Sequence, residues 1–367
     1  FYFIAKRFIS FQDAAVSLDN TKRKTMERNR GRPERFDFFV DKLRQAKAEM
    51  QKIIVGQEEM VTCYLAALIT GGHIWSEGPP GVGKTLGART FAKILDIEFK
   101  AIQFTPDLLP TDIKIAVDLL SGSDSGDVQE EAAFLLKKVI RGVVFTNFLL
   151  VDEANRAPQK VQAALLEVMQ EREVKTGAKT HKLDRPYMVA LTSNFIEHEG
   201  TYHISEALAD RVTLKTRLDY PTFEEECRIA AMRKDIEADR IELKKVFTKE
   251  EIVEMQDLFD SLYHYAPNHP LTEYAVSIAR AVRAQKDFVT YGPTPRGSAD
   301  LLVSASALAM IEGIREVSPD HVKKMALPAL RGTFNLKADP EDGGKDHDQI
   351  ITEAIREDVK VVAEKRS

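Results

Sequence analysis

Residues 78–85 have the side chains and the spacing of a phosphate-binding site. They read Gly-Pro-Pro-Gly-Val-Gly-Lys-Thr and fit the pattern G-x-x-x-x-G-K-[ST], the phosphate-binding loop of nucleotide-hydrolysing enzymes. Glycines let the backbone curl so that successive N–H groups point at phosphate oxygens. In such a loop Lys84 brings a positive charge to the β- and γ-phosphates, and the hydroxyl of Thr85 binds Mg²⁺. The residues expected to contact nucleotide are Gly78, Pro79, Pro80, Gly81, Val82, Gly83, Lys84, Thr85 and Leu86.

The flanking sequence favours this interpretation over an ordinary glycine-rich turn. Residues 73–77 are typical of a short strand that runs into the loop, and residues 86–95 are typical of the helix that follows it. The positive end of a helix that starts near Lys84 would face the same anion. The sequence therefore predicts a nucleotide site at the junction of a strand and a helix.

An acidic pair follows a fully apolar run. Residues 148–151 read Phe-Leu-Leu-Val, as expected of a buried parallel strand, and end in Asp152 and Glu153. An Asp-Glu pair by itself is most often surface acidity, but the carboxyl end of a central strand lies next to the phosphate loop in a parallel sheet. We expect Asp152 to hold Mg²⁺ through water, and Glu153 to position and activate the attacking water.

Three further residues are weaker candidates when they are judged from the sequence alone. Asn194 follows a strand expected at 187–192, where it either contacts the γ-phosphate or its water, or stands in a turn, and the residues alone leave both alternatives open. Arg211 stands in Ala-Asp-Arg and Arg296 in Gly-Pro-Thr-Pro-Arg, but most arginines are solvated surface residues. Their roles stay open at this level.

The elements that must position these residues change character near residue 222. Apolar residues at alternating three- and four-residue steps between Phe36 and Ile53 predict a helix, and Gly71-Gly72 is expected to end a second one. Strands are expected at 73–77, 99–104, 148–151, 187–192 and 212–218, with a hairpin whose arms carry Val174 and His181. Strands that alternate with helices predict an α/β fold with a parallel sheet covered on both faces.

Helices without any convincing strand follow. They are expected at 223–235, 249–263, 271–287, 295–314 and 319–330. We therefore predict a basic, poorly ordered arm over residues 1–33, an α/β nucleotide-binding domain over 34–222, and a smaller all-helical domain over 223–367.

Composition and charge limit the class of protein. The chain has 367 residues, of which 44% are hydrophobic and 30% are charged, as in a globular protein with a sizeable core. No apolar run reaches the length of a membrane span, and no cleavage site of a secretory signal follows the first residues. A net charge of −5 argues against nonspecific binding of nucleic acid as the main activity.

The remaining ionisable and sulfur-containing residues suggest no second type of chemistry. Cys63 and Cys227 make neither a disulfide framework nor a metal cluster, so a reducing cytoplasm is the expected location. His198 and His203 lack the spacing of a helical zinc pair. The basic residues of the arm either stay solvated or contact an acidic partner. They are Lys22, Arg23, Lys24, Arg28, Arg30, Arg32 and Arg35.

Several long segments resemble the MoxR family of AAA+ ATPases, and the resemblance covers nearly the whole chain after Glu34. The matching segments are 54–57, 77–85, 103–113, 152–158, 164–167, 199–202 and 295–296. This resemblance implies an AAA+ core followed by a helical lid, with ATP and Mg²⁺ as cofactors and ATP hydrolysis as the reaction.

The resemblance also implies roles that spacing could not assign. Asn194 corresponds to sensor 1, and Arg296 to sensor 2, which reaches the γ-phosphate from the lid of its own subunit. Arg211 corresponds to the arginine finger, which reaches the nucleotide of a neighbouring subunit. Gly56-Gln57 matches the segment that lines the adenine pocket, and Arg156 matches another family arginine near the subunit boundary.

A finger supplied to a neighbour has a consequence for assembly. The contact between subunits is then head-to-tail and is expected to close into a ring. Members of the MoxR family are usually hexamers that act as chaperone-like machines on other proteins, and their partners often carry von Willebrand factor A domains. The resemblance therefore implies a homo-oligomeric, hexameric ring that matures or activates a protein client.

This chain departs from the family at two loops. Phe195 stands where the family usually has proline after the sensor asparagine, and the stretch 202–207 lacks the two prolines usual before the finger. Losing prolines loosens a loop, which would affect how rigidly Arg211 is presented. The region 112–145 matches the place of an extra insert in the second helix, and the hairpin near Gly177 matches an insert ahead of sensor 1.

Other functions on the same fold stay open. A nucleic-acid machine or transcription activator is disfavoured by the net negative charge, and the Gly-Ala-Phe-Thr-Gly-Ala loop of σ54 activators is absent. A chelatase-type motor subunit is a close alternative that the sequence does not exclude. A nucleotide-bound scaffold without activity conflicts with the complete set of Lys84, Thr85, Asp152 and Glu153.

Overall fold

The computed structural model describes residues 33–116, 140–176, 179–195, 201–337 and 344–364. Several predicted features lie outside these residues: the basic arm before residue 33, most of the region 112–145, the hairpin tip at Gly177, and Glu199-Gly200. Within the described ranges, none of the helices combines the length and the apolar character needed to cross a membrane.

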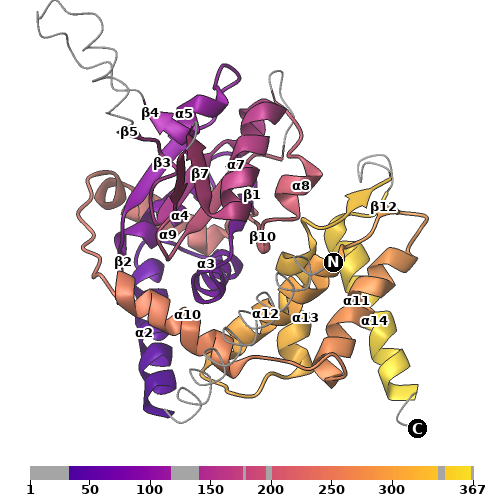
Figure 1. Ribbon diagram of the computed structural model, residues 1–367. Coiled ribbons are helices and arrows are strands. Elements are labelled where there is room, and N and C mark those ends of the chain that lie inside the picture. Colours follow the sequence, from indigo (N-terminus) through magenta and orange to yellow (C-terminus); the bar gives the residue numbers. More distant parts are fainter. Residues whose placement is uncertain (1–32, 117–139, 177–178, 196–200, 338–343, 365–367) are drawn as a thin grey trace, which may run out of the picture.

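A five-stranded sheet forms the centre of the first half of the chain (Figure 1). Its strands stand in the order β10-β1-β9-β6-β3, and every neighbouring pair is parallel. The bounds are β1 Ile74–Glu77, β3 Phe99–Gln103, β6 Phe148–Asp152, β9 Met188–Ser193 and β10 Leu214–Arg217. The predicted α/β fold with a parallel sheet is confirmed.

Side chains that alternate along these strands pack into two separate hydrophobic clusters. Ile74 and Leu150 pack with the helices α2, α3 and α4, whereas Trp75 and Leu149 pack with α5 and α7 on the other face. The bounds of these helices are α2 Pro33–Gln51, α3 Glu58–Thr70, α4 Lys84–Lys93, α5 Pro110–Lys114 and α7 Gln159–Glu171. Both faces of the sheet are therefore covered, as expected of parallel strands.

Short elements complete this half. The predicted hairpin is present, because β7 Glu173–Thr176 pairs antiparallel with β8 Lys179–Lys182 and sets Val174 opposite His181. Gly71 ends α3 in the left-handed region, at φ 63°, as expected of a helix-ending glycine. The other short elements are β2 Leu95–Asp96, β4 Ile115–Ala116, β5 Ile140–Arg141, the 3₁₀ turn η1 Ala154–Arg156 and α8 Glu206–Ala209.

The second half is mostly helical, and its five predicted helices are confirmed. They are α9 Phe223–Glu237, α10 Lys249–Leu262, α11 Pro270–Ala284, α12 Pro295–Glu312 and α13 Pro319–Leu330. A sixth helix, α14 His347–Glu364, was not expected. The expectation of no strand here was wrong: β11 Phe247–Thr248 pairs with β2, and β12 Val289–Tyr291 pairs with β13 Asn335–Leu336. Strands of two or three residues are too short to show the alternation that predicts a strand.

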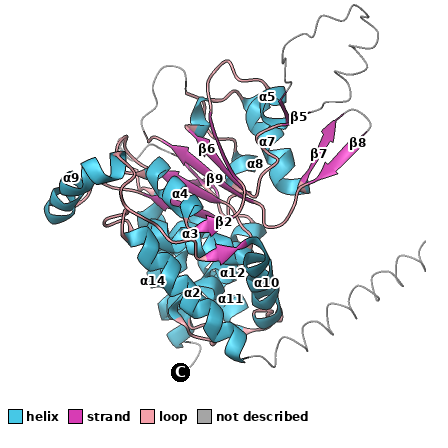
Figure 2. Ribbon diagram, turned by 90° about the vertical axis from the view of Figure 1, so that its left-hand side faces the viewer, coloured by secondary structure: helices cyan, strands magenta, loops and turns pink. Residues whose placement is uncertain are grey.

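One hydrophobic core joins the two halves. The cluster that contains Phe39 and Leu65 of the first half also contains Met255, Ile278 and Leu301 of the second, and both α10 and α12 contact α3. The predicted boundary at residue 222 falls at the start of α9, which buries no side chain and stands away from the body in Figure 2. The division into domains stays a prediction, because the core is continuous across it.

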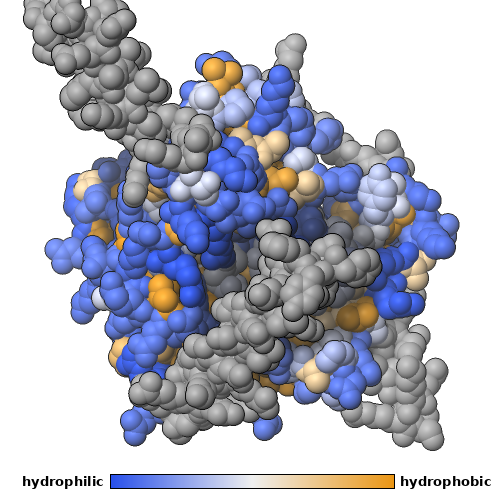
Figure 3. Space-filling model, viewed as in Figure 1, coloured by the Kyte–Doolittle hydropathy of each residue, from blue (hydrophilic) through white to orange (hydrophobic). Residues whose placement is uncertain are grey.

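The described residues on the face seen in Figure 1 form no single large apolar patch. Figure 3 shows that the described residues on the face seen in Figure 1 are mostly hydrophilic, with apolar positions in small separate groups.

Candidate active site

The phosphate loop joins β1 to α4, as the sequence predicts, but its glycines serve two different purposes. Gly81 and Gly83 have φ of 83° and 97°, a region that side chains rarely adopt, so these two supply the tight curl. Gly78 does not share that conformation. A Cβ on Gly78 would lie 2.6 Å from the backbone oxygen of Leu218, so this glycine is required by the close approach of the chain that follows β10.

Lys84 connects the loop to the end of a neighbouring strand. Its Nζ donates to the backbone oxygens of Gly78 at 2.7 Å and Pro79 at 2.6 Å, and to Asn194 Oδ1 at 2.9 Å. Burial lowers the pKa of the ammonium group, while the carboxylate of Asp152 acts in the opposite direction. The structure therefore brings the predicted lysine and the predicted sensor asparagine into contact.

Thr85 and Asp152 also meet. The Thr85 hydroxyl donates to Asp152 Oδ1 at 2.8 Å, and the hydroxyl of Thr192 donates to the same oxygen. A hydroxyl and a carboxylate at this separation suit Mg²⁺, which binds hard oxygen ligands and usually takes the rest of its shell from water and substrate phosphates. Among the described residues no group of three or more His, Cys, Asp or Glu could hold a metal by itself. These donors therefore fit a metal that arrives with a nucleotide.

Glu153 is held in an unusual backbone conformation just beyond β6. Its φ is 55°, a left-handed value that costs a non-glycine residue roughly 1–3 kcal/mol. Its N–H donates to Thr192 Oγ1 at 3.1 Å, and its carboxylate lies 2.5 Å from Arg156 Nε. These contacts fix both the backbone and the side chain of the predicted catalytic carboxylate.

The predicted adenine segment lies beside the start of α9. A Cβ on Gly56 would lie 2.9 Å from the Glu225 carboxyl group, and Gln57 Nε2 donates to the backbone oxygen of Asp219 at 3.1 Å. Leu86, the last residue of the predicted nucleotide set, lines a cavity of about 370 Å³ together with Ile53. The cavity continues between α4 and the end of α9.

Arg211 lies at the opposite edge of the sheet from the phosphate loop. It precedes β10, and the N–H groups of Thr213 and Leu214 donate to the backbone oxygen of His73, the residue before β1. Because β1 and β10 are parallel, this edge holds the amino ends of the strands, whereas the phosphate loop follows the carboxyl end of β1. With its amide oriented to satisfy both groups, the Gln170 oxygen accepts from Arg211 Nε at 2.8 Å and from Nη2 at 2.6 Å.

Arg296 stands with Arg211 and not with Lys84. It lies in the first turn of α12, where its Nε is 3.4 Å from Asp300 Oδ2. The hydroxyl of Thr294, which caps the same helix, donates to Asp210 Oδ1 at 2.6 Å. This position differs from the expectation that Arg296 reaches the γ-phosphate of its own subunit, because the start of α12 is bonded to the segment that carries Arg211.

Two titratable groups at the amino edge have shifted pKa values. Burial raises the pKa of the Asp300 carboxyl to about 6 despite the opposing effect of Arg296, and Asp210 acts in the same direction as burial. Burial lowers the pKa of His73 to about 3, with Arg172 and Arg296 acting in the same direction. His73 is therefore neutral at pH 7, and its Nδ1 accepts from the Val189 N–H at 3.0 Å.

Several contacting residues were not singled out from the sequence. Thr192 follows an apolar strand run just ahead of Asn194, and that position is the only signal that could have identified it. Gln170 and Asp300 carry no local signal, because each acquires its partner only through packing between distant segments. The contact between Arg156 and Glu153 spans three residues and could have been anticipated.

Two family models match this chain. The family described as "ATPase family associated with various cellular activities (AAA)" matches residues 73–214, and the AAA lid domain matches residues 280–354. The chain is 37% identical over 308 residues to the chaperone MoxR1 of Mycobacterium tuberculosis, covering 82% of this chain and 77% of that protein.

Two further relatives match most of the chain. The protein YeaC of Bacillus subtilis is 33% identical over 314 residues, which covers 85% of this chain and 93% of the relative. A crystal structure from Cytophaga hutchinsonii, assigned as an ATPase, superposes with a TM-score of 0.75 at 32% identity and covers 88% of this chain and 96% of that one. The present chain is an enzyme that hydrolyses ATP and has an α/β nucleotide-binding core followed by a helical lid. The chain therefore belongs to the MoxR family of AAA+ ATPases.

Proposed function

We propose that this chain hydrolyses ATP with Mg²⁺ in a closed, hexameric ring and uses the reaction to remodel, mature or activate a protein client. The observation that carries this proposal is the separation of two groups of residues on one chain. Lys84, Thr85, Asp152 and Asn194 meet at the carboxyl edge of the sheet, while Arg211 and Arg296 stand at the amino edge.

Within one subunit, the residues of the carboxyl edge would bind and orient the nucleotide. Lys84 would neutralise the β- and γ-phosphates, while Thr85 would hold Mg²⁺ directly and Asp152 would hold it through water. The metal, when bound, supplies charge neutralisation between the β- and γ-phosphate oxygens. Glu153 would orient the attacking water and accept its proton, and the ion pair with Arg156 supports a fixed carboxylate for that task. Asn194 would contact the γ-phosphate or that water.

The arginines would complete the site of the next subunit. An arginine that approaches the γ-phosphate stabilises the charge of the transition state and is worth large rate factors. Arg211 and Arg296 share one edge, which supports a role for both at the neighbour's nucleotide and replaces the expected role of Arg296 within its own subunit. Such a head-to-tail contact closes into a ring when the rotation between subunits permits it.

The protein client is the part of the proposal that rests on relatives. The Mycobacterium tuberculosis relative is named a chaperone, which supports a similar role for this chain. We extend the proposal to a partner with a von Willebrand factor A domain and to a location in the cytoplasm. The free thiols of Cys63 and Cys227 are compatible with a reducing compartment.

Mixtures of two inactive variants test the shared site. Lys84→Ala should bind nucleotide weakly but keep its arginines, whereas Arg211→Ala should keep nucleotide but lack the finger. If sites are shared, mixing should restore hydrolysis to about one quarter of the wild-type rate, since one interface in four joins an intact loop to an intact finger. Mixtures as inactive as the separate variants would contradict the shared site.

The dependence of the rate on protein concentration provides a second test. Activity per subunit, measured with Mg²⁺ present, should climb and then saturate as rings form. A flat, appreciable rate from a chain that sizing shows to be a monomer would overturn the ring. Strong stimulation by DNA would favour a nucleic-acid machine instead.

A further inference from the structure

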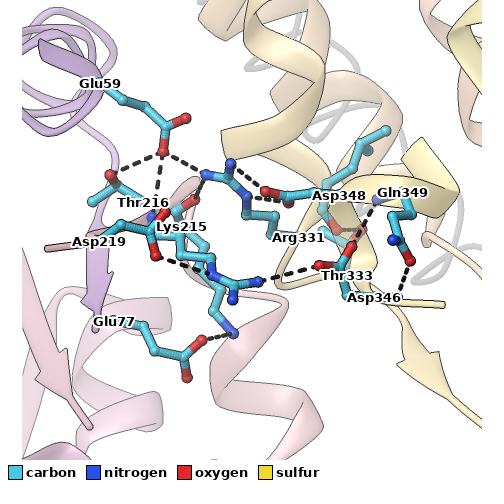
Figure 4. Close-up of polar contacts among 12 residues, drawn as sticks. Glu59, Glu77, Lys215, Thr216, Asp219, Arg331, Thr333, Asp346, Asp348 and Gln349 are labelled. Atoms are coloured by element: carbon cyan, nitrogen blue, oxygen red, sulfur yellow. Dashed lines mark hydrogen bonds and ion pairs between the residues drawn. The ribbon is translucent and has the colours of Figure 1, made fainter. Parts of the chain in front are cut away.

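The start of α14 is fixed to the core by a buried arginine. The side chain of Arg331 is 7% exposed, and its guanidinium donates to both carboxylate oxygens of Asp348, from Nε at 2.5 Å and from Nη2 at 2.9 Å (Figure 4). Its Nη1 bonds Glu59 of α3, which also accepts from the Thr216 hydroxyl of β10 at 3.0 Å. A buried, bidentate guanidinium with carboxylates on both sides holds its neighbours in one geometry.

Two residues before Asp348, a second contact leads toward the nucleotide site. Asp346 Oδ2 lies 3.5 Å from Nη1 of Arg217, the last residue of β10. Arg217 pairs in the parallel register with Glu77, the residue that precedes the phosphate loop. The lid is therefore joined to the sheet at the level of the phosphate loop.

Arg217 continues the connection to the residue after the sensor. Its guanidinium carbon lies 4.9 Å from the centre of the Phe195 ring, within the range of a cation–π contact. Phe195 directly follows Asn194, whose Oδ1 accepts from Lys84 Nζ at 2.9 Å.

We propose that Phe195 and Arg217 are positioning residues that hold Asn194 against Lys84, and that Asp346 makes this hold depend on the position of the lid. The inference rests on the proposed role of Asn194 at the γ-phosphate. A shift of the start of α14 would move Asp346, loosen Arg217 and release the backbone next to Asn194. The position of the lid would thus change the contact between Asn194 and Lys84 in the same subunit.

The expected size of the change in kcat follows from the exposure of the Arg217 side chain. The side chain of Arg217 is 39% exposed, and a cation–π contact at such a site changes an equilibrium by only about two- to fivefold. Positioning residues of this kind change the rate constant of hydrolysis more than the affinity for ATP, because the γ-phosphate contact matters most in the transition state.

Kinetics of the full chain with Mg²⁺ and ATP test the inference through a double-mutant cycle. Phe195→Leu keeps an apolar side chain but removes the aromatic face, and it should lower kcat about two- to fivefold with KM unchanged. Phe195→Tyr should restore kcat. Asp346→Asn should lower kcat in the wild-type background but have no further effect in Phe195→Leu, because the two changes cut the same connection.

Matched controls separate this result from a loss of stability. Asp320→Asn neutralises an exposed carboxylate of α13, one that pairs with Lys323 at 3.4 Å away from the connection, and it should leave kcat unchanged. Thermal unfolding of every variant should match the wild type within a few degrees. Effects of Phe195→Leu and Asp346→Asn that multiply independently, or no effect of either, would overturn the inference.

Asn194→Ala distinguishes failure of the inference from failure of the proposed function. It should lose hydrolysis and keep nucleotide binding if the proposed role of Asn194 holds. Normal turnover by Asn194→Ala would overturn that role. Loss of turnover in Asn194→Ala together with an additive cycle would leave the role intact and refute the connection to the lid.

Discussion

The two edges of the central sheet carry polar clusters of different kinds. At the carboxyl edge, Lys84 contacts Asn194 and Thr85 contacts Asp152, so the predicted phosphate and metal ligands already lie together in one chain. At the amino edge, Arg211 is paired with Gln170, and Arg296 with Asp300. Those partners hold the arginines, but they offer no phosphate-binding backbone.

This difference teaches which half of the chemistry one chain can supply. A loop that binds phosphate must be preorganised, because successive N–H groups have to converge on one anion. An arginine that acts on another subunit needs only a side chain that points toward the neighbour and a partner that holds it in place. The strands lie between the two groups of residues, and under the proposed function each arginine therefore serves the phosphate loop of a neighbouring chain.

The largest expected effect comes from removing the charge of the amino edge. Arg211→Ala should lower the steady-state rate of ATP hydrolysis by about 10³-fold, because the transition-state charge would lose its partner. Nucleotide affinity, measured by fluorescent-nucleotide titration, should stay near the wild-type value. Arg280→Ala, which removes an exposed arginine from α11, is the control and should be fully active. Equal activity of the two variants would remove the distinction between the edges.

At the carboxyl edge, the catalytic carboxylate has the next largest effect. Glu153→Gln keeps the shape of the side chain but cannot accept a proton, so hydrolysis should fall by about 10²-fold or more. Binding of ATP and assembly, followed by size-exclusion chromatography, should persist. Glu171→Gln at the exposed end of α7 provides the matched control. Normal turnover by Glu153→Gln would mean that another group activates the water.

Lys84 should affect binding itself rather than the chemical step alone. Lys84→Ala removes a charged hydrogen-bond donor from the loop, and nucleotide affinity should fall by about 10- to 100-fold. Lys160→Ala, an exposed lysine of α7, should bind as the wild type does. Titration with a fluorescent nucleotide measures both. Unchanged affinity in Lys84→Ala would show that the carboxyl edge is not the phosphate site.

The smallest expected effect is a change in the free energy of unfolding, and it comes from Asp300 at the amino edge. The pKa of Asp300 is raised from 3.8 to about 6, so the folded chain binds its proton more tightly than the unfolded chain does. The stability contributed by this group therefore falls as pH rises through that window. The unfolding free energy of Asp300→Asn relative to wild type should rise by about 1–3 kcal/mol between pH 4 and pH 8.

Denaturant unfolding at several pH values measures this difference. Asp320→Asn, an exposed carboxylate on α13, should show no comparable dependence on pH. A constant difference between Asp300→Asn and wild type across the range would mean that the carboxylate is as well solvated in the folded chain as in the unfolded one.

Much of the carboxyl edge could be predicted because its signals are local. The loop of residues 78–85, the apolar run before Asp152 and the strand before Asn194 each combine a recognisable element with a polar side chain at its end. In a parallel sheet the carboxyl ends of neighbouring strands meet at one edge, so a prediction of the strands also predicts that these side chains meet. The five strands were confirmed, and the structure brings Thr85 to Asp152 and Lys84 to Asn194, whereas the roles of these residues stay predictions.

The sequence by itself therefore determined the phosphate loop, the five strands of the central sheet, most of the helices, and the family. Only the tertiary structure decided that Arg296 lies with Arg211, that Gly78 is needed by the approach of Leu218, and that Arg331 joins α14 to α3 and β10. Glu59 and Arg331 are 272 residues apart in the chain. Contacts over such separations leave no periodic or local pattern, because they are set by how the elements pack on one another and not by the conformation of either segment.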